Sequence, residues 1–309
     1  MKTVKAFAPA TVANVSCGFD VLGFAVDSPG DEVTMFLTDD PGIVITKITG
    51  DQGRLPLEAE RNTAGVAVQA FLSAINSAQG VSMQIDKYLP LGSGMGSSAA
   101  SSVAALVAIN HLMNEPFTRE QLLPFAMEAE RVACGSAHAD NVAPSLLGGF
   151  VLIRDYEPLD VTKIPVPDKL YCTLVHPHLE LKTEDSRRVL KPVIPLKDAI
   201  TQWGNIAGLV VGLMKPDYAL IGRSLKDVVA EPTRSVLIPG FDIIKAAALK
   251  AGALGCGISG SGPTIFVLSN DHATALQTGE VIQQEFTKLH LKSEVYVSKI
   301  NEAGARIVA

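Results

Sequence analysis

A run of small residues in the first third of the chain has the composition of a phosphate-binding loop. Its members are Pro90, Leu91, Gly92, Ser93, Gly94, Met95, Gly96, Ser97, Ser98, Ala99, Ala100 and Ser101. Glycines at alternate positions allow backbone N–H groups to converge, and the dipole of a following helix favours negative charge at the helix start. We therefore expect this loop, residues 90–101, to hold a phosphate group.

The loop does not match the two better-known phosphate loops. The P-loop of the common NTPases needs a lysine directly after its last glycine, and no lysine stands between Lys87 and the end of the expected helix. The dinucleotide fingerprint needs a third glycine at the position of Ser97 and a second strand, which the helical segment that follows does not provide. A flexible turn before a buried helix of small residues is the alternative that the loop alone leaves open.

Two further polar clusters lie in apolar surroundings. His138, Asp140 and Asn141 stand within four positions, and such a group serves as a metal half-site, as a general base with its orienting partner, or as hydrogen-bonding turn residues. Asn14 and Asp20 are isolated in the apolar loop near the start of the chain. Because a buried carboxylate is costly unless it is paired, Asp20 either caps a turn or faces a ligand.

The second half of the chain adds arginines and another glycine loop. Arg187 and Arg234 lie near hydroxyl residues, and their guanidinium forks match carboxylates and phosphates, whereas exposed ion pairs are the alternative. The Gly/Ser loop 257–263, which includes Gly260, precedes an apolar strand. It either closes over the same anion or forms a tight turn with positive φ.

Composition limits the classes of function. The chain has 309 residues, 47% of them hydrophobic, which is enough for about two domains. A net charge of −6 without a basic run argues against bulk electrostatic binding to nucleic acid or membranes. The four cysteines lack metal or disulfide spacing, and neither a leader nor a membrane span is indicated, so we expect reduced thiols and a cytoplasmic protein.

The expected strands and helices must bring these polar clusters and glycine loops close together in space. The period-2 pattern over 81–85 predicts a strand before the loop, and the run 97–113 predicts a helix after it. Strands are also expected at 32–37 and 43–48, joined by a turn.

Capping residues predict the remaining helices that matter here. Asn62 is expected to cap a helix that Gly80 ends, and Thr118 opens a capping box for a helix to about residue 133. Glu128 and Glu130 lie in that second helix, where either is a candidate Mg²⁺ ligand or simply a solvated side chain. The Pro- and Asp-rich segment 155–167 indicates a domain boundary.

In their order and spacing, the opening loop, residues 90–100 and residues 257–263 resemble the three motifs of the GHMP family of small-molecule kinases. This family is named for galactokinase, homoserine kinase, mevalonate kinase and phosphomevalonate kinase, and the resemblance covers nearly the whole chain. Residues 14–23 and 138–144, with Arg187 and the run 231–234, resemble the members that act on homoserine. The resemblance implies ATP-dependent phosphorylation of the side-chain hydroxyl of L-homoserine to O-phospho-L-homoserine, on the route to threonine.

The same resemblance implies a two-domain α+β fold. Residues 1–160 would form the ATP-binding domain, with a left-handed βαβ crossover, and residues 161–309 a ferredoxin-like domain. ATP and the amino acid would lie between the two domains. Homodimers are common among such relatives, so we expect a homodimer.

Site residues follow from the resemblance as well. ATP would be held by residues 90–101, with Asn62 near the adenine, and Mg²⁺ by Ser98 and Glu130. The residues expected to contact the amino acid are Asn14, Asp20, His138, Thr183, Arg187, Arg234 and Gly260. The residues expected to take part in catalysis are His138, Asp140 and Asn141.

The opening motif departs from that of mevalonate kinase and galactokinase. Those relatives carry a Lys or Arg after Pro-Gly and use an Asp base, whereas this chain has Pro9, Ala10 and Thr11. Asp140 and Asn141 occupy the region of the family's base, and an amide cannot accept a proton at neutral pH. A loose transition state needs little early proton removal, so we expect transfer without a dedicated strong base.

Three rival functions remain. A GHMP kinase acting on mevalonate or a sugar is disfavoured by Arg187 and Arg234 together with His138. A non-catalytic ligand sensor is disfavoured by Ser98 and Glu130 beside the intact loop. An unrelated phosphate-loop protein would show no affinity for ATP.

Overall fold

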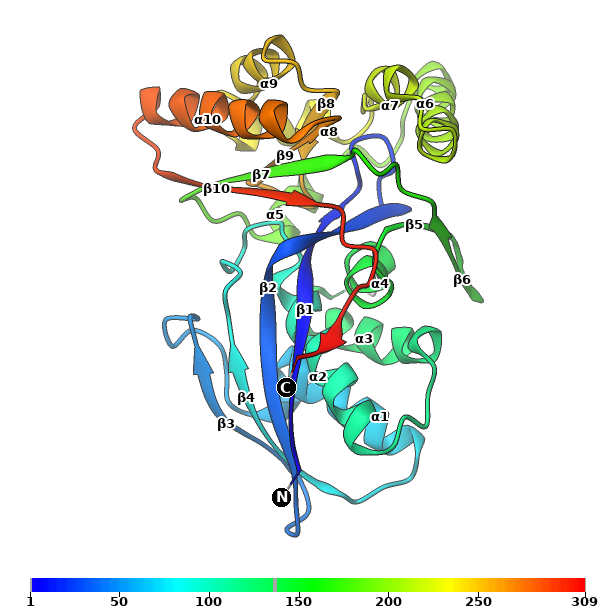
Figure 1. Ribbon diagram of the computed structural model, residues 1–309, viewed down its shortest axis with the longest axis vertical. Helices are drawn as coiled ribbons and strands as arrows, with labels where there is room; N and C mark the ends of the chain where they lie inside the picture. The colour runs from blue at the N-terminus through cyan, green and yellow to red at the C-terminus, as the bar shows by residue number, and fades with distance from the viewer. Residues whose placement is uncertain (1, 136–137, 309) are drawn as a thin grey trace.

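The computed structural model describes residues 2–135 and 138–308, and for residues 133 and 134 it describes the backbone alone (Figure 1). Ser136 and Ala137, beside the His138 cluster, lie outside the described residues, as does the side chain of Cys134. The described residues form a seven-stranded and a four-stranded sheet, each covered by helices. In the described part of the chain, no helix is long and apolar enough to cross a bilayer.

The first sheet has the strand order β11-β1-β2-β4-β3, and β5 extends it from β2 and pairs with β6. Its strands are β1 (Thr3–Ala13), β2 (Leu22–Thr38), β3 (Ile43–Thr49), β4 (Gly80–Asp86), β5 (Phe150–Tyr156), β6 (Leu159–Ile164) and β11 (Arg306–Ile307). The expected strands 32–37 and 43–48 are confirmed, but they are not neighbours. β4 lies between them because the chain returns from β3 through a helix and pairs parallel to β3.

Helices pack on one face of this sheet (Figure 1). They are α1 (Thr63–Ala74), α2 (Ser97–Leu112), α3 (Arg119–Cys134) and α4 (Ala139–Leu147), with a short 3-10 turn, η1 (Ala59–Arg61), before α1. α2 is buried along nearly its whole length, which its alanines and serines permit because they let the sheet and neighbouring helices approach closely.

The capping predictions are largely confirmed. The Asn62 side chain accepts a hydrogen bond from the Ala64 amide at 3.0 Å, and Thr118 forms the expected capping box with Gln121. The prediction that Gly80 ends α1 was wrong, because Gly80 begins β4. Asn76 follows the end of α1 with a φ of +51°, so an asparagine takes the left-handed position that we had assigned to glycine.

The second sheet is antiparallel, with the strand order β10-β7-β9-β8. Its strands are β7 (Tyr171–Pro177), β8 (Gly255–Ile258), β9 (Ile265–Ser269) and β10 (Ser293–Lys299). Its helical segments are α5 (Thr183–Arg188), α6 (Leu196–Met214), α7 (Tyr218–Ser224), α8 (Glu231–Arg234), η2 (Ser235–Leu237), α9 (Phe241–Lys250) and α10 (His272–Lys288). Numbered along the chain, the strand order is 4-1-3-2, with α9 and α10 in the two crossovers, which is the expected ferredoxin-like arrangement.

A shared core fixes one sheet against the other. The Phe24 ring stacks on Phe150 with centroids 4.5 Å apart and meets the edge of Phe266, which belongs to the second sheet. The division expected after residue 160 stays a proposal. β6 pairs with the first sheet as far as Ile164, and the chain returns after β10 to place β11 beside β1 (Figure 1).

Candidate active site

A cleft of about 380 Å³ lies between the two halves of the molecule and gathers most of the expected site residues. Those lining it are Asn14, Asp20, Asn62, Leu91, Gly92, Ser93, Gly94, Gly96, Ser97, Ser98, Ser101, Glu130, His138, Asp140, Asn141, Thr183, Arg187, Arg234 and Gly260. Met95, Ala99 and Ala100 are instead buried in the core, and Pro90 lines a neighbouring hollow. The structure therefore brings together residues that are as far apart as Asn14 and Gly260.

Glycine is required in the loop 90–101 by its conformation and by its neighbours. Gly92, Gly94 and Gly96 all have positive φ, between +63° and +76°. A Cβ atom on Gly94 would lie 2.4 Å from the Ser259 carbonyl oxygen, and one on Gly96 would lie 2.1 Å from Thr11 Oγ1. Gly96 is also the N-cap of α2. The first two residues of that helix, Ser97 and Ser98, therefore lie in the cleft wall directly after the loop.

The second glycine loop supports the first. Ser259 Oγ donates to the Gly94 carbonyl at 2.7 Å, and the Thr264 amide donates to the Ser93 carbonyl at 3.2 Å. Gly260 has a φ of +56°, and its amide donates to the Ala13 carbonyl at 3.2 Å. The alternative of a tight turn with positive φ is confirmed, and the closing of this loop over an anion stays a prediction, for which Gly260 lies in the cleft wall.

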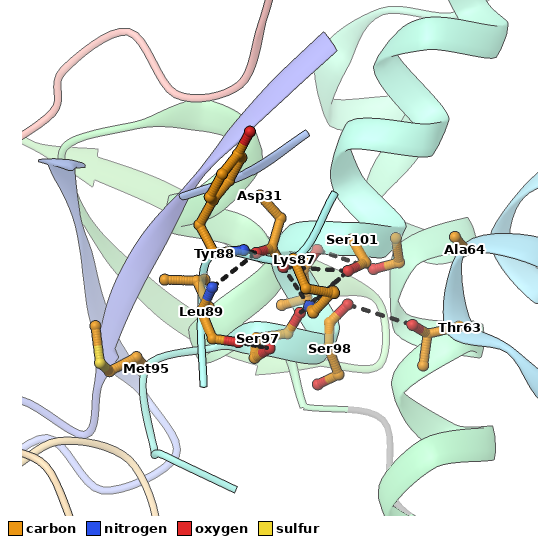
Figure 2. Close-up of polar contacts among 12 residues, drawn as sticks. Asp31, Thr63, Ala64, Lys87, Tyr88, Leu89, Met95, Ser97, Ser98 and Ser101 are labelled. Carbon is orange, nitrogen blue, oxygen red and sulfur yellow. Dashed lines mark hydrogen bonds and ion pairs between the residues drawn. The ribbon is translucent and has the colours of Figure 1, made fainter. Parts of the chain in front are cut away.

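A buried ion pair lies beneath the start of α2 (Figure 2). The ammonium group of Lys87 pairs with the Asp31 carboxylate and donates to the Ser97 carbonyl and to Ser101 Oγ, both at 2.7 Å. Asp31 Oδ1 in turn accepts from the amides of Tyr88 and Leu89, at 2.9 and 3.0 Å. The pair thus joins β2, the segment after β4 and the first turn of α2.

Sequence reasoning missed this pair. It used Lys87 only to exclude a P-loop and did not consider Asp31. The available signal was the position of each charged residue at or inside an apolar strand, where an unpaired charge is costly. Because Lys87 also lines the cleft, the pair belongs to the wall of the site.

The opening loop is held in an uncommon backbone conformation. Asn14, Val15, Ser16 and Asp20 all have positive φ although none is glycine. The Asn14 side chain donates to the Gly260 carbonyl at 2.9 Å and accepts from the Asp20 amide at 3.0 Å. Asn14 therefore ties the loop both to itself and to the second half of the chain.

The side chain of Asp20 faces basic groups. Arg187, on α5, donates to both carboxylate oxygens, at 2.8 and 3.2 Å, and His138 Nδ1 lies 3.9 Å from Oδ2. Of the two alternatives for Asp20, a turn cap or a group facing a ligand, the position in the cleft favours the second.

Arg234 is buried rather than exposed, which excludes the simple surface ion pair. Its guanidinium donates to the carbonyls of Ser186 and Gly260, each at 3.1 Å, and lies 4.9 Å from the centroid of the Phe19 ring. The Arg187 guanidinium lies 5.6 Å from the same ring. Burial and the charge of Arg187 lower the pKa of Arg234, so the two arginines form a concentrated positive region in the cleft wall.

The start of α4 contributes three side chains to the site. Burial, and then the nearby Asp20 charge, raises the pKa of Asp140 to about 7, and its Oδ1 has no hydrogen-bond partner among the described residues. Asn141 Oδ1 accepts from Thr11 Oγ1 at 2.7 Å. Burial lowers the pKa of His138 despite the attraction of Asp20. Asp140 is therefore a carboxyl group in the cleft whose pKa lies near neutral pH.

The two candidate glutamates of α3 differ in position. Glu128 is partly exposed and pairs with Arg131, whereas Glu130 is buried and lines the cleft together with Ser98. Within the described residues, no group of three His, Cys, Asp or Glu side chains is arranged to hold a metal ion. A hydroxyl and one carboxylate suit Mg²⁺ that is bound mainly through nucleotide phosphates.

Comparisons with known proteins agree with this geometry. The family model for the GHMP kinases N terminal domain matches residues 62–149, and the model for the GHMP kinases C terminal matches residues 209–288. The chain is 54% identical to homoserine kinase from Chlorobium phaeovibrioides over the full length of both proteins. It is 42% identical to homoserine kinase from Xylella fastidiosa, over 98% of this chain and 94% of the relative.

Solved structures give the same result. The crystal structure of homoserine kinase from Cytophaga hutchinsonii is 56% identical and superposes with a TM-score of 0.97, covering 100% of this chain and 98% of the other. Mevalonate kinase from L. major, 16% identical, shares the fold with a TM-score of 0.74 over 96% of each chain. The expected two-domain α+β fold is confirmed. The chain belongs to the GHMP kinase family, within its group of homoserine kinases.

Proposed function

We propose that this protein transfers the terminal phosphoryl group of ATP to the side-chain hydroxyl of L-homoserine, giving O-phospho-L-homoserine. The observation that carries this proposal is the composition of the cleft wall, which includes both the glycine loop and a cluster of Asp20, Arg187 and Arg234. The names of the full-length relatives support the same reaction.

ATP is proposed to lie along the loop 90–101 with its adenine near Asn62. The cleft wall near Asn62 includes the apolar side chains of Leu55, Pro56 and Ile85, which suit a flat base. Glycines 92, 94 and 96 allow the backbone to approach the phosphates closely.

Mg²⁺ is proposed to bind with ATP through Ser98 and Glu130. Their position in the cleft wall, with a buried carboxylate beside the helix start, fits an ion that also takes ligands from phosphate oxygens. When bound, the ion would neutralise charge on the phosphate oxygens during transfer.

Homoserine is proposed to exchange with the ion pair that Asp20 and Arg187 form with each other. The substrate carries an ammonium group and a carboxylate. The ammonium group would pair with Asp20 in place of Arg187, and the carboxylate would pair with Arg187 in place of Asp20. Arg234 supplies a second guanidinium for the carboxylate, while Asn14, Thr183, His138 and Gly260 complete the wall. The substrate hydroxyl is then proposed to face the terminal phosphate of the nucleotide.

Catalysis is proposed to depend on positioning, with Asp140 as a weak proton acceptor. A hydroxyl that attacks a metaphosphate-like group loses its proton late, so a strong base is unnecessary. Asp140 can accept that proton, whereas Asn141 can only orient the reacting groups by hydrogen bonding. His138, held beside Asp20, helps to place the substrate.

A homodimer in the cytoplasm is the proposed state of the protein. α6 exposes an uncharged apolar stripe, whose members are Leu196, Ile200, Trp203, Ala207, Val211 and Met214. A second copy of the chain is proposed to cover this exposed apolar face. The buried free thiols of Cys17, Cys172 and Cys256 suit a reducing compartment. Light scattering should give a dimer that Trp203→Glu converts to a monomer, whereas Val236→Glu, at another exposed site, should not.

The activity test is ADP release with Mg-ATP in the presence of L-homoserine, mevalonate, galactose or L-serine, with the phosphate located by NMR. We expect turnover with homoserine and phosphate on its terminal oxygen. Turnover with mevalonate or galactose instead would point to another GHMP kinase. Binding of ATP without turnover on any of the four would overturn the proposal in favour of a ligand sensor.

A further inference from the structure

Tyr156, the last residue of β5, connects two parts of the proposed amino-acid site through its hydroxyl group. Tyr156 Oη donates to the Asp20 carbonyl at 2.9 Å and accepts from the Ala139 amide at 3.3 Å. Its ring meets the edge of the His138 imidazole, with centroids 6.5 Å apart and an interplanar angle of 87°. Sequence reasoning did not single out this residue.

The first of these contacts restrains the Asp20 loop. Asp20 has a φ of +58°, a conformation that a non-glycine residue holds only when its surroundings fix it. The Asn14 side chain holds the amide of Asp20, and Tyr156 holds its carbonyl. With both of its peptide groups restrained, Asp20 has its carboxylate fixed relative to Arg187 and His138.

The second contact restrains the start of α4. Ala139 is the first residue of that helix, and its N–H is one of those that a helix leaves without an internal partner. The N-cap residue, His138, makes no side-chain capping bond within the described residues, so Tyr156 supplies the acceptor from outside the helix. Asp140 and Asn141 follow directly, and their positions depend on this start.

We propose that Tyr156 is a positioning residue, whose hydroxyl sets the separation between the Asp20 loop and the start of α4 and thereby shapes the subsite for the amino-acid substrate. The hydroxyl suits this task because it donates one hydrogen bond and accepts another at the same time. A carbonyl oxygen only accepts and an amide N–H only donates, so neither partner could take both roles. Burial raises the pKa of Tyr156, so its hydroxyl stays neutral and keeps its proton over the pH range in which the enzyme works. The side chain itself need not touch the substrate.

Tyr156→Phe tests the inference, because phenylalanine keeps the ring and removes the hydroxyl. We expect the KM for L-homoserine to rise about tenfold, the size expected from the loss of one to two neutral hydrogen bonds. The KM for ATP should change less than twofold, because the hydrogen bonds and the ring contact of Tyr156 within the described residues join it to Asp20, His138 and Ala139 rather than to the loop 90–101. Tyr296→Phe is the matched control, since it removes a hydroxyl that donates to Glu294 on β10 at 2.5 Å, and among the described residues neither Tyr296 nor Glu294 lines the cleft.

A merely structural role for Tyr156 would raise both KM values together with a fall in Tm. That result, or an unchanged KM for homoserine in Tyr156→Phe, would overturn the inference. A second readout is independent of turnover: exchange of the Ala139 amide hydrogen should be slow in the unsubstituted protein and faster in Tyr156→Phe. Equal exchange in the two proteins would also count against the inference.

The inference rests on the proposed homoserine kinase activity, and the experiment separates the two. If the unsubstituted protein does not phosphorylate homoserine, the proposed function fails whatever the amide exchange shows. If it does so and Tyr156→Phe behaves like the unsubstituted protein, the role of Tyr156 alone is refuted.

Discussion

The carboxylate of Asp20 and the guanidinium of Arg187 are joined by two hydrogen bonds of 2.8 and 3.2 Å across the cleft, although 167 positions separate them in the chain. The position of each group is restrained by its surroundings. Asp20 belongs to a restrained loop, and Arg187 lies on α5 beside the ring of Phe19. An ion pair of this kind is preformed for a zwitterion, since substrate binding exchanges partners without leaving either charge unpaired.

Arg187→Lys should raise the KM for homoserine by about tenfold or more, because lysine keeps the charge and loses the planar fork. Arg188→Lys is the matched control. Arg188 is exposed and pairs with Glu184 on the same helix, so its replacement should leave the kinetics unchanged. Steady-state kinetics on both variants make the comparison, and equal effects would contradict the assigned role of Arg187.

The activity should increase with pH through about 7, as the carboxyl group of Asp140 loses its proton. Its pKa is raised to about 7, so only the ionised form, above that pH, can accept a proton from the substrate. The kcat/KM profile of the unsubstituted protein should show this limb, and that of Asp140→Asn should lack it and lie at least tenfold lower. A profile that is flat from pH 6 to 8 would argue that Asp140 takes no part.

Ionisation of Asp140 should lower the stability of the protein, although it should raise the activity. Between about pH 4 and pH 7 the folded protein binds a proton at Asp140 that the unfolded chain has released, so the free energy of unfolding falls as pH rises through this window and stays lowered above it. Asp140→Asn removes that cost and should stabilise the protein at pH 8 by up to a few kcal/mol. Urea denaturation at pH 5 and pH 8 measures it, and a smaller gain at pH 8 than at pH 5 would contradict the sign.

Lys87→Met should destabilise the protein by about 3–5 kcal/mol, because it leaves the buried carboxylate of Asp31 without its countercharge. Adding Asp31→Asn removes the charge as well and should recover part of the loss. Lys5→Met is the comparison, since the Lys5–Glu32 pair is partly exposed and should matter far less. Chemical denaturation gives the three values, and similar losses for Lys87→Met and Lys5→Met would refute the importance of the buried pair.

Gly96→Ala should impair ATP binding, since the new Cβ atom would lie 2.1 Å from Thr11 Oγ1 at a residue with a φ of +70°. Alanine is strained at that φ, and relieving the contact moves either the loop or the Thr11 side chain that donates to Asn141, so we expect at least a tenfold rise in the KM for ATP. Gly204→Ala provides the control, because a Cβ atom at this exposed helical position meets nothing within 4 Å. There we expect unchanged kinetics and a gain of about 0.5–1 kcal/mol in stability.

Local patterns in the sequence determined the elements that carry the site. Alternation predicted β4, the unbroken run after Gly96 predicted α2, and side-chain capping predicted the starts of α1 and α3 at Asn62 and Thr118. These succeeded because the interactions that decide them lie within a few residues along the chain. The three motifs in their order also identified the family.

The tertiary structure alone decided which residues meet. The pairing of Lys87 with Asp31, of Thr11 with Asn141 and of Arg187 with Asp20 depends on how strands and loops far apart in the chain pack together. Burial likewise separated Glu130 from Glu128 and raised the pKa of Asp140, whereas the sequence shows only that each is acidic. The physical reason is that charge pairing and desolvation act over distances of a few ångströms in space, and the spacing of residues along a chain does not specify those distances.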